Sequence, residues 1–155
     1  MNDTPLAAAG RALEHAYGDV LRTRMQGLPI VNAALRVELV GLRAWNGSGV
    51  GVLITPWCMN FVALPLGQDW PAVRIGTSQV LALPSGRYDM LAAHLPEVGP
   101  HLLGSLISPM QDFADQDAAV TAAHAAMDLL FEAPAAAPRP ADTARRDFLL
   151  GRPQR

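Results

Sequence analysis

The chain has 155 residues and half of them are apolar, which is the length of one domain and enough for a substantial core. Twelve basic residues, all arginine, and fourteen acidic ones give a formal net charge of −2, which excludes binding to nucleic acid through bulk charge. The start of the chain lacks the basic cluster of a secretory signal, and no apolar run is long enough for membrane insertion. The single cysteine, Cys58, excludes an internal disulfide and a thiolate metal cage. These features predict a soluble, cytoplasmic protein with one domain.

The first part of the chain predicts one helix followed by strands. Thr4 and Pro5 mark a helix start, and apolar residues at three-and-four spacing extend the helix over residues 5–26. From Leu35 the apolar period changes to two, and a shift of phase at Gly41 predicts a β-bulge. A hairpin turn is expected at residues 46–49 because they contain Asn-Gly. The apolar run that follows, over residues 50–55, predicts a central strand buried on both faces.

The rest of the chain predicts more strands, a second helix and a tail. Strands are expected over residues 59–64, 79–83, 87–94 and 101–107, and they are antiparallel because their connections are short. The segment Ser108-Pro109-Met110-Gln111 matches a capping box, which predicts one helical turn, a restart at Asp115 and a helix over residues 116–131.

These elements together predict an α+β fold. It has an antiparallel sheet of about six strands, with an N-terminal and a C-terminal helix packed on one face. We expect residues 1–132 to form this single domain. Residues 133–155 are expected to be an Ala/Pro-rich linker and a flexible basic tail.

The four histidines do not form a strong catalytic or metal-binding pattern. His15 and His124 lie in alanine-rich helices, where a surface position is the ordinary interpretation. His94 and His101 flank one turn and could bind a metal together with Glu97, but zinc is usually held by four ligands or by three in a well-ordered arrangement. We therefore expect no metal site.

The remaining reactive residue types also indicate no enzyme class. Cys58 follows Trp57 within an apolar run, which is typical of an inert buried thiol. The glycines at residues 47–51 lie in a hairpin and not between a strand and a helix, so they do not form a phosphate-binding loop. The sequence therefore predicts no catalytic residue and no cofactor.

Apolar and aromatic residues beside prolines stand out at the ends of predicted strands. We take them as candidate partner-binding residues: Pro56, Trp57, Met59, Phe61, Trp70, Ser108, Pro109, Met110 and Phe113. Such residues are ordinarily core, but a tryptophan next to a proline at an element end favours incomplete burial, and methionine adapts to varied apolar ligands. Asp112, Asp115 and Asp117 follow at a predicted helix start, where they either complement the helix dipole or pair with arginines. An apolar groove rimmed by aspartates predicts binding of a peptide with arginines before an apolar stretch.

The C-terminal tail carries a segment similar to the twin-arginine export motif. Arg145 and Arg146 match its arginine pair, and Phe148 and Leu149 match its next two apolar positions, while Leu150 replaces the usual lysine. An export signal is N-terminal and precedes a long apolar stretch, so this segment does not export the chain.

The net charge is divided unevenly between the two parts of the chain. Residues 1–132 carry a charge of −5 and residues 133–155 a charge of +3, so the body of the protein favours arginine-bearing peptides, its own tail included.

Four segments in the same order resemble a known family. They are Gly51-Val52-Leu53-Ile54-Thr55-Pro56-Trp57, Leu83-Pro84-Ser85-Gly86, Ser105-Leu106-Ile107-Ser108-Pro109-Met110, and Arg145-Arg146-x-Phe148-Leu149-x-Gly151. From about residue 10 onward the chain resembles the HybE-type, or HupJ-type, [NiFe]-hydrogenase assembly chaperones. The resemblance implies a cytoplasmic, non-enzymatic maturation factor for the small, iron–sulfur subunit of an uptake hydrogenase. It implies the large subunit and a rubredoxin-like maturation protein as further partners.

These observations lead to one main hypothesis. The body of the protein binds the twin-arginine signal peptide of the [NiFe]-hydrogenase small-subunit precursor and holds back export until assembly is complete. The apolar residues around Trp57, Met59 and Met110 receive the hydrophobic part of the signal, and the three aspartates receive its arginines. The tail occupies the same site as a pseudo-substrate.

Two alternatives remain open at this point. One is a structural scaffold that bridges the small and large hydrogenase subunits without touching the signal peptide. The other is a small metal or redox enzyme that uses His94, His101 and Cys58.

Overall fold

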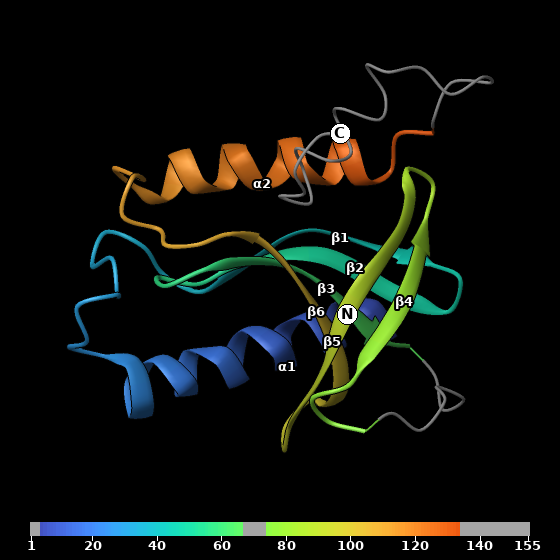
Figure 1. Ribbon diagram of the computed structural model, residues 1–155. Helices are drawn as coiled ribbons and strands as arrows, with labels where there is room; N and C mark the ends of the chain where they lie inside the picture. The colour runs from blue at the N-terminus through green and yellow to red at the C-terminus, as the bar shows by residue number, and fades with distance from the viewer. Residues whose placement is uncertain (1–3, 67–73, 134–155) are drawn as a thin grey trace.

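A computed structural model describes residues 4–66 and 74–133, which form two α-helices on a six-stranded sheet (Figure 1). In chain order the elements are α1 (Pro5–Val20), η1 (Leu21–Met25), β1 (Glu38–Trp45), β2 (Ser48–Ile54), β3 (Met59–Pro65), β4 (Ser78–Leu83), β5 (Gly86–Leu95), β6 (Gly99–Ile107) and α2 (Gln116–Leu130). No helix in these two stretches is long and apolar enough to cross a membrane. Trp70 and the whole twin-arginine-like tail segment lie outside the described residues.

The first helix begins where the sequence predicts it. The Thr4 hydroxyl accepts a hydrogen bond from the Ala7 amide at 3.0 Å, and Pro5 occupies the first turn, where its missing N–H costs nothing. The helix prediction over residues 5–26 is confirmed to within one residue, but η1, its last turn, is π-helical. Gly27 then adopts a φ of 89°, which only glycine reaches without strain.

Local sequence also sets the register of the first hairpin. Asn46 and Gly47 have φ values of 49° and 79°, the pair of positive angles that a two-residue hairpin turn requires. Gly41, with a φ of 70°, lies at the register shift in β1. The bulge brings Leu42 to the same face of the sheet as Leu39 despite their odd spacing. The turn and the bulge predicted from the sequence are therefore both confirmed.

All six strands pair antiparallel in the order β1-β2-β3-β6-β5-β4. The last of the six strands in sequence, β6, therefore lies between β3 and β5, and the β4–β5 hairpin forms one side of the sheet. This arrangement confirms the predicted α+β fold, an antiparallel sheet of six strands with an N-terminal and a C-terminal helix packed on it.

The two helices cover opposite faces of the sheet, whereas the sequence analysis predicted one face (Figure 1). Along β2, Val50, Val52 and Ile54 face α2 in the main core. Leu53 points the other way and packs near Leu13 of α1. Every residue of β2 is buried, as predicted for a central strand. A strand buried on both faces needs a cover on each, which is why the one-face prediction was wrong.

The sheet curls until its two edges meet around α2. The Trp45 indole N–H in β1 donates to the Ala82 carbonyl in β4 at 2.7 Å. The same indole packs edge-on against Phe131 with ring centroids 5.5 Å apart, and the Ser85 amide donates to the Leu130 carbonyl at 3.2 Å. Figure 1 shows the β4–β5 hairpin rising beside this end of α2. The curl thus holds the C-terminal end of α2 in place.

The connection from β6 to α2 is irregular and lacks the predicted helical turn. Asp115 is the N-cap of α2, and its carboxylate accepts a hydrogen bond from the first turn at 2.9 Å, so the predicted restart is confirmed. The capping box from Ser108 does not form because the Gln111 side chain turns to another segment. Its amide donates to the Ile30 carbonyl at 2.8 Å. A tertiary contact therefore replaces the local one.

Candidate functional site

Three segments meet at one end of the molecule, and Asn32 holds them together. Its backbone N–H donates to the Pro56 carbonyl at 2.9 Å. Its side-chain amide donates to the Met110 and Phe113 carbonyls, both at 2.9 Å, and its side-chain oxygen accepts from the Ala34 amide at 3.0 Å. We call this region the Asn32 junction and define it by residues 28–36, 55–58 and 108–117. Sequence reasoning missed Asn32, because its partners lie about eighty positions away along the chain.

Gln116, the first residue of α2, ties the same region to the start of β1. Its side-chain oxygen accepts from the Arg36 amide at 2.9 Å, and its nitrogen donates to the Glu38 carboxylate at 3.0 Å. The side chain is buried, so these bonds satisfy polar atoms that have left water. The Arg36 guanidinium pairs with the same carboxylate at 3.3 Å.

The structure buries several of the predicted apolar site residues, and two of them, Met59 and Phe61, lie in β3 outside the junction. Met59, Phe61 and Met110 are at most 1% exposed and belong to the main core. Pro56 is buried as well. The other described members of this predicted group are half-buried or exposed: Trp57, Phe113, Ser108 and Pro109. The buried members are therefore core residues, and the remaining ones give the junction its partly exposed apolar surface.

Two exposed apolar residues of the junction were missed by sequence reasoning. Leu28 and Ile30 are 45% and 42% exposed. They flank Pro29 just after the first helix ends, and the Gln111 side chain contacts the backbone of this loop. The signal that could have found them is the one noted at Trp57, namely an apolar side chain next to proline at the end of an element. Single exposed apolar residues are common, so Leu28 and Ile30 are of interest because they lie two positions apart in one loop of the junction.

The three predicted aspartates are all exposed at the start of α2. Asp115 caps the helix, which confirms its dipole-complementing role. Asp117 lies in the first helical turn, and Asp112 follows Gln111, whose side chain reaches the Ile30 loop. The junction therefore joins a segment with exposed carboxylates to a loop with exposed apolar side chains.

His101 forms part of a buried polar pair and is not paired with His94. Its Nδ1 lies 2.9 Å from the Gly99 carbonyl and must donate there, so its Nε2 accepts from the Tyr17 hydroxyl at 3.0 Å. Burial lowers the pKa of His101 and raises the pKa of Tyr17 to about 12. Ala93 pairs with His101 across the strands, so His94 points to the other face of the sheet. Both nitrogens of His101 are thus engaged.

Cys58 has the environment of an unreactive thiol. Its sulfur lies 3.4 Å from both the Thr55 hydroxyl and the Asn60 amide, and burial raises the pKa of the thiol. Within the described ranges, His94, His101 and Cys58 do not form a group that could hold a metal. The geometry therefore gives no support to the metal or redox enzyme considered from the sequence.

Comparison with known proteins agrees with the fold and with the resemblance. The family model described as "[NiFe]-hydrogenase assembly, chaperone, HybE" matches residues 8–151. The hydrogenase expression/formation protein HoxT of Azotobacter vinelandii is 45% identical over 92% of this chain and 91% of its own length. A protein named probable rubredoxin HupJ, from Rhodobacter capsulatus, is 39% identical over 79% of this chain but only 44% of its own length.

A solved structure shares the fold. The solution structure of HybE from Escherichia coli superposes with a TM-score of 0.66 over 90% of this chain and 88% of that one, at 21% identity. With a family match over nearly the whole sequence and relatives of this identity, the chain belongs to the HybE family of [NiFe]-hydrogenase assembly chaperones.

Proposed function

We propose that this chain is a cytoplasmic, non-enzymatic chaperone that binds the small-subunit precursor of a [NiFe]-hydrogenase through its twin-arginine signal peptide. Binding holds back export until cofactor insertion and assembly with the large subunit are complete. Family membership supports the role in assembly. The observation that carries the finer proposal is the Asn32 junction, where the loop with exposed Leu28 and Ile30 is hydrogen-bonded to the segment that carries three exposed aspartates.

The chemistry of this surface suits both parts of a twin-arginine signal. Each guanidinium pairs with a carboxylate through charge-assisted hydrogen bonds, and the apolar part of the signal covers the exposed Leu28 and Ile30 side chains. A single exposed ion pair contributes only about 0.2–1 kcal/mol, so the apolar contact must supply most of the affinity. The arginine pairs then set which peptides bind.

The carboxylates give the first test of this proposal. Replacing Asp112 and Asp117 together by asparagine is expected to weaken binding of a synthetic twin-arginine signal peptide about tenfold, from the loss of two exposed ion pairs. Asp115 is left intact because it caps α2. Asp128→Asn, exposed at the far end of the same helix, is the matched control and is expected to bind normally. Isothermal titration calorimetry at low salt measures all three proteins.

Two results would contradict the proposed site. One is equal affinity of the double variant and the wild type. The other is full retention of a precursor that lacks its signal peptide, which would favour a scaffold that bridges the two hydrogenase subunits. A peptide with two lysines in place of the arginines is expected to bind the wild type more weakly than the twin-arginine peptide does. The double variant is expected to bind the two peptides with similar affinity.

The tail provides a second test. The proposal that Arg145, Arg146, Phe148 and Leu149 act as a pseudo-substrate rests on their sequence. A linker of this length gives an effective concentration of about 1 mM, so a tail with an intrinsic Kd of about 0.1 mM would weaken signal-peptide binding about tenfold. Deleting residues 140–155 is therefore expected to tighten binding by that factor. Unchanged affinity would contradict autoinhibition, and weaker binding would indicate a tail that holds the client.

A further inference from the structure

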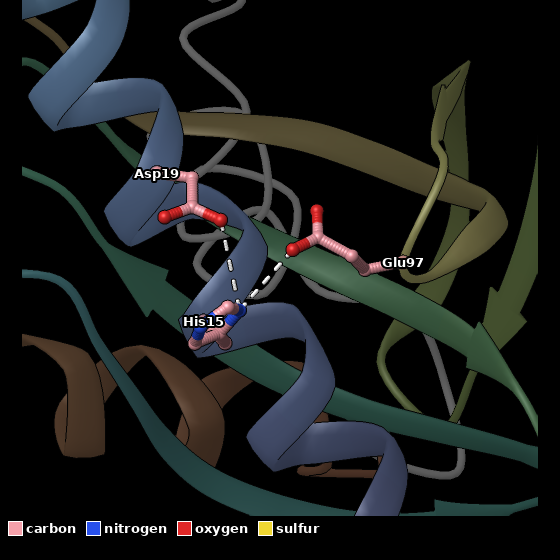
Figure 2. Close-up of side chains that lie close together, drawn as sticks. All are labelled: His15, Asp19 and Glu97. Carbon is pink, nitrogen blue, oxygen red and sulfur yellow. Dashed lines mark hydrogen bonds and ion pairs between the residues drawn. The ribbon is translucent and has the colours of Figure 1, made fainter.

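Three potential metal ligands converge between α1 and the turn that joins β5 to β6, away from the Asn32 junction. His15 Nδ1 lies 3.2 Å from Glu97 Oε2 and 3.7 Å from Asp19 Oδ2. The three ligand atoms all lie within 4.8 Å of one another. His15 and Asp19 stand one turn apart on α1, and Figure 2 shows both carboxylates pointing toward the imidazole. The sequence analysis placed Glu97 with His94 and His101, but the fold pairs it with His15.

One imidazole nitrogen faces two carboxylates in this cluster. Nδ1 carries at most one proton and so donates one hydrogen bond, while the two facing oxygens bring like charges within 4.8 Å of each other. Arg22 pairs with Oδ1 of Asp19, and this leaves Oδ2 directed at His15 (Figure 2). A divalent cation bound to all three atoms would engage both facing carboxylates together, whereas the single Nδ1 position can donate to only one of them.

The geometry and the donor types select the class of cation. Ligands about 2.0–2.1 Å from a tetrahedral zinc ion lie about 3.3 Å apart, close to the two distances from Nδ1. Exposed side chains close the remaining gap by rotation about their own bonds. One imidazole with two carboxylates suits Zn²⁺ and its transition-metal neighbours, whereas Mg²⁺ and Ca²⁺ prefer oxygen ligands alone.

We propose that His15, Asp19 and Glu97 bind a divalent transition-metal ion, with Zn²⁺ as the best fit. The ion joins α1 to the β5–β6 turn, two elements 82 residues apart along the chain. Three protein ligands leave a fourth coordination position, which water fills. The side chains are 68%, 38% and 44% exposed, so this position opens to solvent and is accessible to a ligand atom from a partner protein.

The test uses the full-length chain without a histidine tag. Calorimetric titration with zinc chloride is expected to show one saturable site with a stoichiometry of about one zinc per chain, and saturating zinc is expected to raise the melting temperature. His15→Ala and Glu97→Gln are each expected to weaken binding at least tenfold. His124→Ala, which removes an exposed histidine from α2, is the matched control and is expected to leave binding unchanged.

The outcomes separate a site from scattered surface binding. Absence of saturable binding to the wild type would overturn the proposal. Equal zinc affinity of His15→Ala and the wild type would also overturn it. So would a loss of affinity in His124→Ala as large as that in His15→Ala, because it would mean adventitious binding by surface histidines. Since the substituted side chains are exposed, both variants are expected to match the wild-type melting temperature without zinc, and that measurement excludes misfolding as the cause of lost binding.

Discussion

Replacing Gly104 by alanine is expected to destabilise the protein by about 3 kcal/mol, at the upper end of the usual cost of overpacking a core. Gly104 in β6 pairs directly with Phe61 in β3, and the Phe61 ring lies over the glycine. An added Cβ would collide with that ring and come within 2.8 Å of the Met90 sulfur. The ring cannot turn aside, because it is fully buried and packs edge-on against Tyr88 with centroids 5.4 Å apart.

Urea unfolding measures this effect, with Gly18→Ala as the control. A Cβ at Gly18 in α1 meets only the end of the Arg22 side chain at 3.5 Å, so that substitution is expected to stabilise the helix by about 0.5–1 kcal/mol. The two alanine variants should therefore move the unfolding midpoint in opposite directions. The packing described above leaves no room for a Cβ at Gly104. A free energy of unfolding for Gly104→Ala within about 0.5 kcal/mol of the wild type would contradict it.

The elements that could be predicted are those fixed by neighbouring residues. Thr4 with Pro5, and Asn46 with Gly47, determine their helix cap and their turn through local geometry alone. The bulge at Gly41 was visible because it shifts the phase of an alternating strand. The uninterrupted apolar run of β2 also implied that each face of the sheet has a helix over it. The prediction that both helices cover one face did not take this into account.

The site was predicted less well because long-range contacts build it. Asn32 and Gln111 take partners 78 to 82 positions away, and His15 meets Glu97 across 82 positions, so no local pattern reveals them. Met59 and Met110 illustrate a second difficulty. An apolar residue beside a proline has the same local sequence whether it lines a groove or fills the core, and the arrangement of the other segments decides which.

Replacing Asn32 by aspartate is expected to destabilise the protein by about 2–4 kcal/mol at pH 7 and to weaken signal-peptide binding by more than the two-aspartate variant does. The substitution keeps the size of the side chain but turns a donor of two hydrogen bonds into an acceptor. A carboxylate oxygen then faces the Met110 and Phe113 carbonyls, each 2.9 Å from the present nitrogen. The loop that carries Leu28 and Ile30 would lose these two bonds to the segment before α2 and keep those from the Gln111 side chain.

Asn46→Asp is the matched control, since it makes the same chemical change at an exposed turn where aspartate accepts a positive φ. Its free energy of unfolding and peptide affinity are expected to stay within about 0.5 kcal/mol of the wild type. Urea unfolding and calorimetry with the same peptide give both quantities for each variant.

A folded Asn32→Asp protein that binds the signal peptide as tightly as the wild type would mean that the junction holds the fold together without forming the binding surface. Weaker binding beyond what the unfolded fraction explains is the expected result, because the apolar and the acidic parts of the surface lie on different segments that Asn32 and Gln111 join.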